Sequence, residues 1–501
     1  MSLKHNVIAN YVGQGYSALI AILIYPLFLQ FLGKESYGLL GFFMTLQAWL
    51  VLFDIGVTPA LSREAAKARI GKSELAGFFN LLKSVEVLFV FCATLTVLTG
   101  LLSVSWVSQS WLNIQSIPLK DVELVLSLMF VVISLQWFLT LYRSVLNGLE
   151  LQVWLNKLTV FTSTVRYPVS LALMYFFDFG LISFVIVQLS CSVFELIFVA
   201  LKVSKYKSLN IPEHNSVFSK SCLVAIAPFA LRIGFSTGVW LFVSQFDRLI
   251  LSSILPIGEF GYFTLVMVVV SGVTRLTSPV SVALLPRFSS MIAAGSMSDF
   301  VKLYRKSTRL MVAFISCLVA FLVFWNEQVL MVWTASADVV QWSNNVLSPY
   351  LIGTGVMGVM AFQYYLQYAF GNLRFHVYLN IVLLLLCVPG VAISAHYYGA
   401  VGTAYFWLSI QCGLFLIWPA FIHGKFVPGL HLKWLLIDVI PVSILITIIV
   451  FIIYSSITYL GLVTGFSAIF IAFGATSVCC VVGILSFVRF LKRVTDNELS
   501  Y

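Results

Sequence analysis

Long uninterrupted apolar stretches dominate this chain and restrict its fold more than any other feature. A stretch of about 20 apolar residues can cross the roughly 30 Å hydrocarbon core of a membrane as a helix. Of the 501 residues, 60% are hydrophobic and 10% are charged. In a water-soluble protein about a quarter of the residues are charged, so much of the surface of this chain must face lipid. The sequence therefore predicts an all-α membrane protein that crosses the bilayer many times and has no room for a soluble domain.

A hydropathy window of about 19 residues predicts fourteen membrane-spanning helices. The N-terminus has a lone Lys4 and no small-residue cleavage site, which favours a retained first span. The expected spans are 7–32, 37–61, 82–104, 120–147, 156–177, 180–201, 223–255, 259–286, 308–332, 346–371, 376–396, 400–422, 435–457 and 464–488. Because fourteen is even, both termini are expected on one side.

Basic residues are distributed unequally between alternate loops. Twenty-three lysines and arginines fall in one set of loops and span ends, whereas the other set holds only Lys34 and Lys120. The positive-inside rule then places both termini in the cytoplasm. The net charge of +10 is accordingly a topology signal, and no nucleic-acid partner is expected. The eight cysteines lack the spacing of a zinc site and the six histidines form no metal-spaced cluster, so no metal or cofactor is expected.

A weak internal repeat appears when the chain is shifted by 223 residues. The shift superposes Gly15 on Gly238, Tyr37-Gly38 on Phe260-Gly261, and Ala60-Leu61 on Ala283-Leu284. The spans are also in phase. We expect two six-helix lobes of the same orientation with the substrate between them. The predicted parts are an N-terminal lobe 1–201, a cytoplasmic linker 202–222, a C-terminal lobe 223–422 and an appended helix pair 435–488.

Four arginines lie inside predicted spans: Arg166, Arg232, Arg248 and Arg275. Facing lipid, each would cost at least about 2.5–3.5 kcal/mol, so we expect them to face the protein interior. Arg232 and Arg275 each lie 12 residues from a basic anchor, which corresponds to a depth of about 18 Å. A cationic chamber at that depth would bind an anion such as a phosphate.

Each of these arginines also has a structural interpretation. Arg166 can pair with the buried acid Glu195 on the next span, and this is as well supported as a binding role. Arg248 follows Asp247 and lies about eight residues from an outer turn, so it can reach the outer headgroups instead. For Arg232 and Arg275 no acid lies within a turn or two on the same helix, which favours a functional role.

Neutral polar side chains form two further candidate groups. Asn10 and Gln14 belong to a polar stripe on the first span, and Gln363 and Gln367 lie beside tyrosines on the tenth. Such residues can line a polar cavity and bond to sugar hydroxyls, or they can join helices to one another.

Two acids, Asp54 and Glu86, are candidates for proton or sodium coupling. The sequence does not distinguish coupling from simple packing between lobes, and the energy source stays open.

Particular segments resemble a known family. They are FLGKESYGLLGF (31–42), the Asp54-x-Gly56 motif followed by Arg63-Glu64, FDRLILSSILPIGEFGYFTL (246–265) and LLPRFS (284–289). These resemble the Wzx-type O-antigen and polysaccharide flippases of the multidrug/oligosaccharidyl-lipid/polysaccharide exporter superfamily. The resemblance is best over 1–90 and 225–290 and extends by topology to 422.

The resemblance implies a V-shaped pair of lobes with a lateral opening, and a function without enzymatic activity. Such a protein would move undecaprenyl-pyrophosphate-linked oligosaccharide across the bacterial inner membrane by alternating access. The cationic cavity residues would be Arg166, Arg232 and Arg275. Its partners would be the lipid-linked oligosaccharide and membrane lipids, with a polysaccharide polymerase and a chain-length regulator as candidate protein partners.

Three alternatives stay open at this point. The family often has twelve spans whereas lipid II flippases have fourteen, so a lipid II-type substrate is one alternative. A multidrug cation antiporter of the same superfamily is another, although a cationic ligand would favour acids in the chamber. A scaffold for a membrane glycosyltransferase is the third, and it would not depend on the chamber charges.

Overall fold

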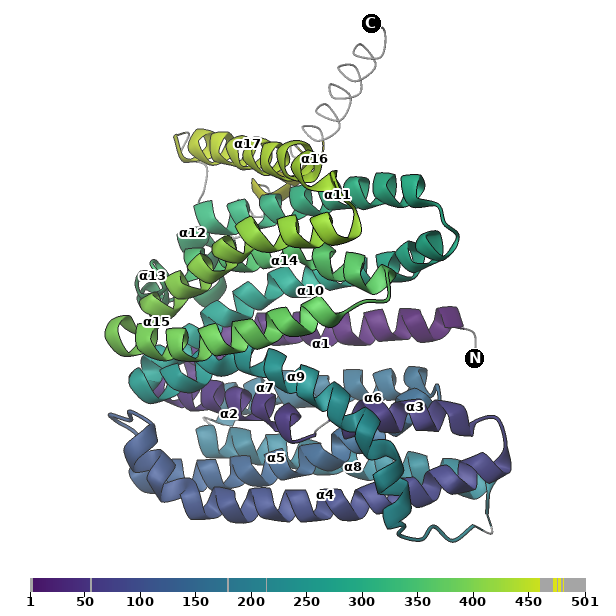
Figure 1. The fold of residues 1–501 in the computed structure, drawn as a ribbon. Helices are drawn as coiled ribbons and strands as arrows, with labels where there is room; N and C mark the ends of the chain where they lie inside the picture. The colour runs from purple at the N-terminus through teal and green to yellow at the C-terminus, as the bar shows by residue number, and fades with distance from the viewer. Residues whose placement is uncertain are drawn as a thin grey trace, which may run out of the picture. The chain divides into compact units, whose positions relative to one another are not determined.

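A computed structural model describes residues 3–54, 56–177, 180–212 and 214–459, together with 472–474, 476–478 and 481. Within these ranges, the side chains of 3–11, 18, 51–53, 278–279 and 281–283 lie outside the description. Every regular element of the described residues is a helix (Figure 1). The prediction of an all-α chain is confirmed.

Many of the helices can cross a membrane. Among the described residues, nine are long and apolar enough, or ten if a bent pair, α13 (Ala337–Ser343) with α14 (Leu347–Ala369), is counted as one span. The chain is a multi-pass membrane protein, and helices suit this setting because they satisfy their own backbone hydrogen bonds. The count of fourteen and the cytoplasmic termini stay predictions. Most of the last expected span, 464–488, lies outside the described residues.

The chain divides into two compact units, 1–261 and 262–501, with the division inside α10 (Ile257–Ala293). The predicted lobe limits at 201 and 223 stay a prediction. Before α10, unit 1 contains α1 (Leu3–Leu32), α2 (Lys34–Phe53), α3 (Val57–Ala68), α4 (Lys72–Trp106), the π-helical turn η1 (Val107–Trp111), α5 (Leu119–Gly148), α6 (Gln152–Thr164), the π-helical turn η2 (Val165–Val169), α7 (Ser170–Phe177), α8 (Leu181–Asn210) and α9 (Lys220–Ile254).

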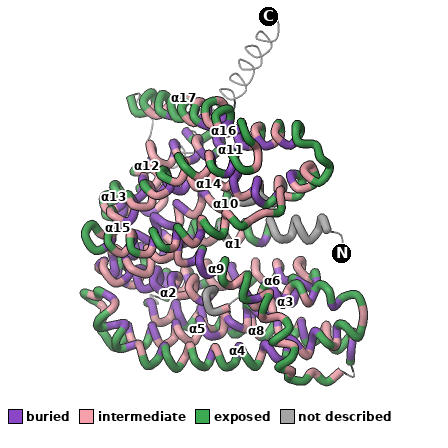
Figure 2. The backbone as a smooth tube through the Cα atoms, viewed as in Figure 1, coloured by how far each residue is buried: buried purple, intermediate pink, exposed green. Residues whose placement is uncertain are grey.

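Helix α5 is the centre of packing in unit 1. It contacts α3, α4 and α8, and the last two run beside it in Figure 1. Its buried residues follow a helical period along most of its length. Figure 2 shows buried and exposed residues alternating along several helices of the chain.

Two spans that were expected to be single helices are interrupted, and the interruptions position polar residues. Span 37–61 becomes α2 and α3 with a break near Gly56, and span 156–177 becomes α6, η2 and α7. Pro168 lies inside η2, and its missing N–H explains a local departure from the α-helical ladder.

One end of unit 1 is closed by the loop between η1 and α5. The Glu35 carboxylate accepts hydrogen bonds from the backbone N–H groups of Ser116 (2.9 Å) and Ile117 (3.3 Å). The backbone N–H of Ile257 donates to the carbonyl of Asn113 over 2.9 Å. The loop therefore joins the start of α2 to the turn between α9 and α10.

Unit 2 is built around an aromatic core. Trp325, Trp434, Tyr304 and Phe362 are among its largest fully buried side chains. Beyond α10 its elements are α11 (Met297–Phe324), α12 (Asn326–Thr334), α13, α14, α15 (Arg374–Phe426), α16 (Leu430–Lys433), the π-helical turn η3 (Trp434–Val439) and α17 (Ile440–Tyr459).

Helix α15 contains a sharp break at Gly399, where φ is 56° and ψ is −141°. This conformation favours glycine because a side chain would strain it. The two halves fold back on one another near the break, since a Cβ on Gly402 would lie 2.3 Å from the carbonyl oxygen of Ser394. The halves coincide with the expected spans 376–396 and 400–422.

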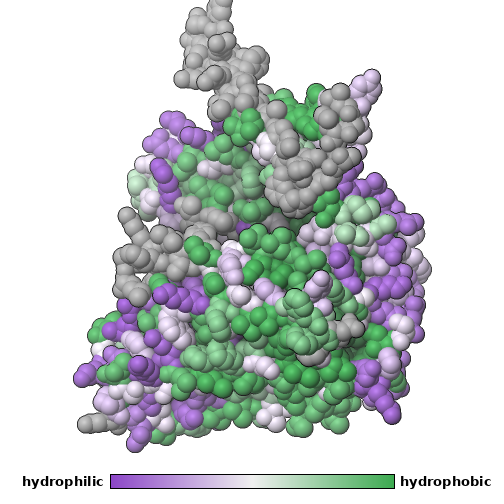
Figure 3. All heavy atoms as spheres, turned by 180° about the vertical axis from the view of Figure 1, so that it is seen from behind, coloured by the Kyte–Doolittle hydropathy of each residue, from purple (hydrophilic) through white to green (hydrophobic). Residues whose placement is uncertain are grey.

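Large apolar side chains are exposed on many helices. On the face drawn in Figure 3, hydrophobic residues cover broad areas and hydrophilic ones gather mainly toward the edges. A soluble monomer rarely exposes apolar patches of this extent, whereas a surface that faces lipid requires them.

Candidate functional site

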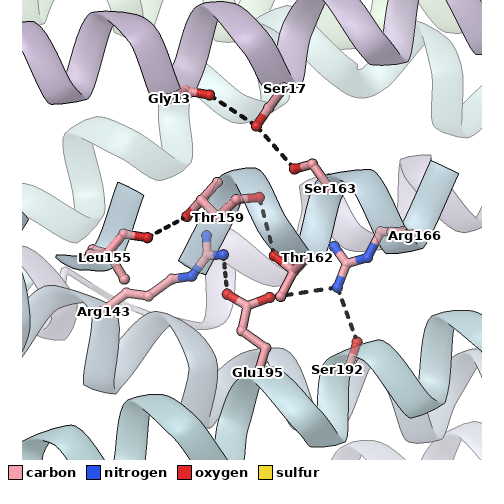
Figure 4. A network of polar contacts seen from close by, with 10 residues as sticks. All are labelled: Gly13, Ser17, Arg143, Leu155, Thr159, Thr162, Ser163, Arg166, Ser192 and Glu195. Carbon is pink, nitrogen blue, oxygen red and sulfur yellow. Dashed lines mark hydrogen bonds and ion pairs between the residues drawn. The ribbon is translucent and has the colours of Figure 1, made fainter. Parts of the chain in front are cut away.

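Two arginines share one buried carboxylate in unit 1 (Figure 4). Glu195 on α8 has a side chain that is 1% exposed, and it pairs with Arg143 from α5 through Oε1 and with Arg166 from η2 through Oε2. The Arg166–Glu195 distance is 3.7 Å, and Arg166 Nη2 also lies 3.5 Å from Ser192 Oγ. The pair expected between Arg166 and Glu195 is present. Arg143 was not expected there, because its position near a span end assigned it to the topological anchors.

This group carries a surplus of positive charge, because two guanidinium groups face a single carboxylate. The side chains of Arg143 and Arg166 are 35% and 21% exposed, so each cation is shielded from water only in part. Their Nε atoms are buried and have no hydrogen-bond partner. Guanidinium groups with spare donors are suited to bind the oxygens of a phosphate or pyrophosphate.

The π-helical turn η2 positions Arg166. A π-turn inserts an extra residue into the helical ladder, and such turns often occur at functional sites. On the side of α1, Tyr16 Oη lies 2.6 Å from Thr164 Oγ1 and Ser17 Oγ lies 3.0 Å from Ser163 Oγ. These bonds fix α1 against α6 immediately before η2. Ser17 continues the polar stripe of Asn10 and Gln14, so this part of the stripe joins helices. Gln14, from the same stripe, is exposed, and the side chain of Asn10 lies outside the described residues.

The Asp54-x-Gly56 motif forms a close junction with α9. Gly56 has a φ of 73°, and a Cβ there would lie 2.3 Å from the carbonyl oxygen of Ala230 and 2.6 Å from the backbone nitrogen of Gly234. Only glycine permits this approach. Arg232 lies between these two contacts on α9 and has an exposed side chain.

Asp54 follows the last residue of α2 and lies three residues before α3 begins at Val57. One of its carboxylate oxygens accepts hydrogen bonds from the backbone N–H (3.1 Å) and the hydroxyl (2.5 Å) of Thr58. These bonds satisfy a backbone N–H in the first turn of α3 and give Asp54 a structural role. A coupling role for Asp54 stays a hypothesis.

The remaining expected site residues lie elsewhere. Arg248 on α9 is half-buried, and its backbone N–H donates to the carboxylate of Asp247 over 2.8 Å. Arg275 on α10 is exposed. Gln363 and Gln367 on α14 are buried in unit 2, at 1% and 0% exposure, and Gln367 donates to the backbone of Gln363.

Glu86, the other acid considered for coupling, lies on α4. Tyr142 donates to it over 2.8 Å and Lys83 pairs with it over 3.2 Å. The carboxylate therefore already has two partners, and coupling through it is a hypothesis.

Unit 2 contains a second ionic cluster, and the sequence did not predict its two arginines there. Asp438 in η3 is fully buried and pairs with Arg305 (2.6 Å) and Arg309 (2.9 Å) of α11. Both arginines were counted among loop anchors. The signal was Asp438 itself, a lone acid within an apolar run. Among the described residues, no group of His, Cys, Asp and Glu is placed to hold a metal ion.

Solved structures of membrane transporters share this fold. Lipid II flippase MurJ in an inward closed conformation matches with a TM-score of 0.67 at 15% identity, over 98% of this chain and 99% of MurJ. An inward-facing MATE family multidrug resistance transporter of the MOP superfamily matches with a TM-score of 0.62 at 15% identity, over 81% of this chain and 95% of the transporter. The fold is that of the MOP superfamily transporters.

The sequence comparison identifies the family within this class. Residues 3–292 match the family described as "Polysaccharide biosynthesis protein", and the chain belongs to that family. A "Putative O-antigen transporter" of Shigella flexneri is 25% identical over 367 residues, which cover 70% of this chain and 81% of the relative. These relatives are transporters and flippases rather than enzymes, and the resemblance seen in the sequence motifs is confirmed.

Proposed function

We propose that this chain is a flippase for an undecaprenyl-pyrophosphate-linked oligosaccharide, such as an O-antigen repeat unit, in the bacterial inner membrane. The pyrophosphate and sugars enter a cleft between two lobes while the polyprenyl tail stays in lipid. Rocking of the lobes then exposes the cleft to each side in turn.

The observation that carries this proposal is the positive surplus at Arg143, Glu195 and Arg166. A polyanionic headgroup is costly to move through a medium of low dielectric constant, and fixed cations reduce that cost. The proposal adds Arg232 and Arg275 from the sequence as further cations along the path, with Arg248 nearer the outer headgroups. It also assigns sugar contacts to Asn10, Gln14, Gln363 and Gln367.

Two relatives of the fold suggest other cargoes. A multidrug cation antiporter would need an available acid, yet Glu195 is occupied by two arginines and Asp54 by Thr58. A lipid II-type flippase remains the nearer alternative because its substrate is also a lipid-linked pyrophosphate. The likeness to MurJ concerns the fold alone, so the cargo must be identified chemically.

The test is carried out in the source bacterium. Deletion of the gene is expected to stop surface polysaccharide assembly and to accumulate the lipid-linked repeat unit in the cytoplasmic leaflet. Mass spectrometry of that lipid distinguishes a polysaccharide unit from lipid II. Complementation with Arg166→Ala, Arg232→Ala or Arg275→Ala at wild-type abundance is expected to restore little polysaccharide.

Arg287→Ala is the matched control, because Arg287 is an exposed arginine on the same helix as Arg275. It is expected to complement fully. Full complementation by all three of the other variants would refute the anion path, and accumulation of lipid II would replace the proposed cargo.

A polysaccharide polymerase and a chain-length regulator are the proposed partners, and co-purification from cross-linked membranes tests them.

A further inference from the structure

A pocket of about 640 Å³ lies in unit 1 away from the paired arginines. Its walls come from α4 and α8, Tyr142 of α5 contributes to it, and the segment before α9 covers part of it. Helices α4 and α8 both pack on α5, so the pocket lies where the two flank that helix. Tyr142 bonds to Glu86 here, whereas the next residue, Arg143, bonds to Glu195. The pocket is thus separate from the site already described.

The polar part of the pocket has a positive surplus. Lys83 and Lys207 line it from opposite helices, together with the single acid Glu86. Glu86 is held by Lys83 and by the Tyr142 hydroxyl, which fixes the carboxylate against the wall. The Lys207 ammonium lies 5.9 Å from the centre of the Phe79 ring. Among the residues that the structure describes, no acid forms an ion pair with Lys207, so its charge is available to an anionic ligand.

The cover of the pocket is fixed in place. Asn80 on α4 accepts from the backbone N–H of Val217 over 3.0 Å, and Ser84 accepts from the backbone N–H of Ser219 over 2.8 Å. These bonds hold the segment over α4. Ser216, which precedes Val217 directly, lines the pocket, and its hydroxyl is buried without a hydrogen-bond partner. A buried hydroxyl without a partner is costly, so this one is expected to bond to a ligand or to water.

The remainder of the pocket is apolar and leads onto a lipid-facing surface. Leu82, Ile197 and Leu201 form its walls, and the last two are 51% and 61% exposed. The exposed apolar surface continues along α8 at Phe194 and Phe198. The site therefore combines a cationic end with an apolar groove, which matches a molecule that has an anionic head and an acyl tail. A free phosphate would use only the first part.

We propose that this pocket binds one anionic phospholipid. The phosphate lies between Lys83 and Lys207 and accepts a hydrogen bond from Ser216, and an acyl chain follows Ile197 and Leu201 along α8. Basic pockets between helices at the membrane surface are suited to such headgroups. The inference is independent of the flippase proposal, because the pocket contains none of the proposed transport arginines.

Native mass spectrometry of the detergent-purified full chain tests this. Phosphatidylglycerol and phosphatidylcholine with identical acyl chains are added in parallel, and inorganic phosphate is added as a competitor. We expect one phosphatidylglycerol to be retained in preference to phosphatidylcholine, and inorganic phosphate not to displace it at equal concentration. Equal retention of the two lipids, or displacement by equimolar phosphate, would overturn the assignment.

Variants locate the binding. Lys83→Gln with Lys207→Gln is expected to weaken retention of phosphatidylglycerol about tenfold or more, because each ammonium near a headgroup contributes appreciably. The matched control is Lys72→Gln with Lys205→Gln, which removes the same charge from exposed positions on the same two helices. An equal loss in this control would show general surface charge instead.

Two single variants keep the test open if the double variant does not fold. Lys207→Gln removes the lysine that is not bonded to Glu86, and Ala200→Phe fills the pocket without changing its charge. Both are expected to reduce retention. Normal retention in folded protein of both variants would refute the site.

Discussion

Gly38 and Gly261 are in direct contact, and they are the two positions that the 223-residue repeat equates. A Cβ on Gly261 would lie 3.1 Å from the backbone nitrogen of Gly38 and 3.2 Å from its Cα atom. A Cβ on Gly38 would lie 1.8 Å from the carbonyl oxygen of Ile257. The close approach of α2 and α10 therefore gives a physical reason for glycine at both positions.

Gly38→Ala is expected to destabilise the protein by at least about 1–3 kcal/mol, because the new methyl group overlaps backbone that cannot move away easily. Gly261→Ala should cost less, since its contacts are longer. Gly77→Ala on α4 is the control, because nothing lies within 4 Å of its Cβ position, and alanine there should be neutral or stabilising. Thermal unfolding in detergent measures all three. Equal effects of Gly38→Ala and Gly77→Ala would contradict the close contact.

Glu195→Gln should reduce stability by about 3–5 kcal/mol, because it leaves two partly buried guanidinium groups without their counter-charge. Glu64→Gln is a suitable comparison. Glu64 pairs with Lys67 on the exposed surface of α3, and such a pair contributes about 0–1 kcal/mol. If the two substitutions shift the unfolding temperature equally, Glu195 does not hold the arginines as described.

Asp438→Asn tests the ionic cluster of unit 2 in the same way. The substitution leaves Arg305 and Arg309 facing a neutral side chain within the packed region of η3 and α11. A loss of about 3–5 kcal/mol is expected. Asp299→Asn, at an exposed pair with Lys302 on the same helix as the two arginines, is the control. Unfolding followed by tryptophan fluorescence suits this unit because Trp325 and Trp434 lie in its core.

The Glu35 carboxylate is expected to make the free energy of unfolding depend on pH. Burial alone would raise its pKa, but the hydrogen bonds from the backbone of Ser116 and Ile117 outweigh this and hold the pKa below its ordinary value of 4.5. The folded state thus favours the charged carboxylate. Its contribution is fully present above the ordinary pKa and is lost as the pH falls through the lower, folded value.

Unfolding measured between pH 7 and pH 3 checks this. The wild type should lose stability on acidification, and Glu35→Gln should be less stable at pH 7 and lose less than the wild type on going to pH 3. An unchanged pH profile in the variant would show that the loop 112–118 does not depend on the charge of Glu35.

The sequence predicted those features of the fold that depend on apolar length. The long helices, the division between spans 376–396 and 400–422, and the Arg166–Glu195 pair follow from hydropathy and from the high cost of an isolated charge in a membrane. The breaks in α2–α3 and α6–α7 were not predicted, because a hydropathy window averages over a single glycine or a π-turn. The ion pairs of Arg143, Arg305 and Arg309 were missed for a related reason. A charge near the end of an apolar run resembles a topological anchor until its partner on another helix is known.

Reconstituted transport is the most direct test of the central claim that arginines carry a lipid-linked pyrophosphate. The chain is placed in liposomes with a fluorescent undecaprenyl-pyrophosphate oligosaccharide, and a membrane-impermeant glycosidase reports the fraction that reaches the outer leaflet. The wild type and Arg287→Ala are expected to expose the lipid far faster than empty liposomes, and the folded Arg166→Ala and Arg232→Ala variants to approach the empty rate. Wild-type rates in both folded arginine variants would contradict the account.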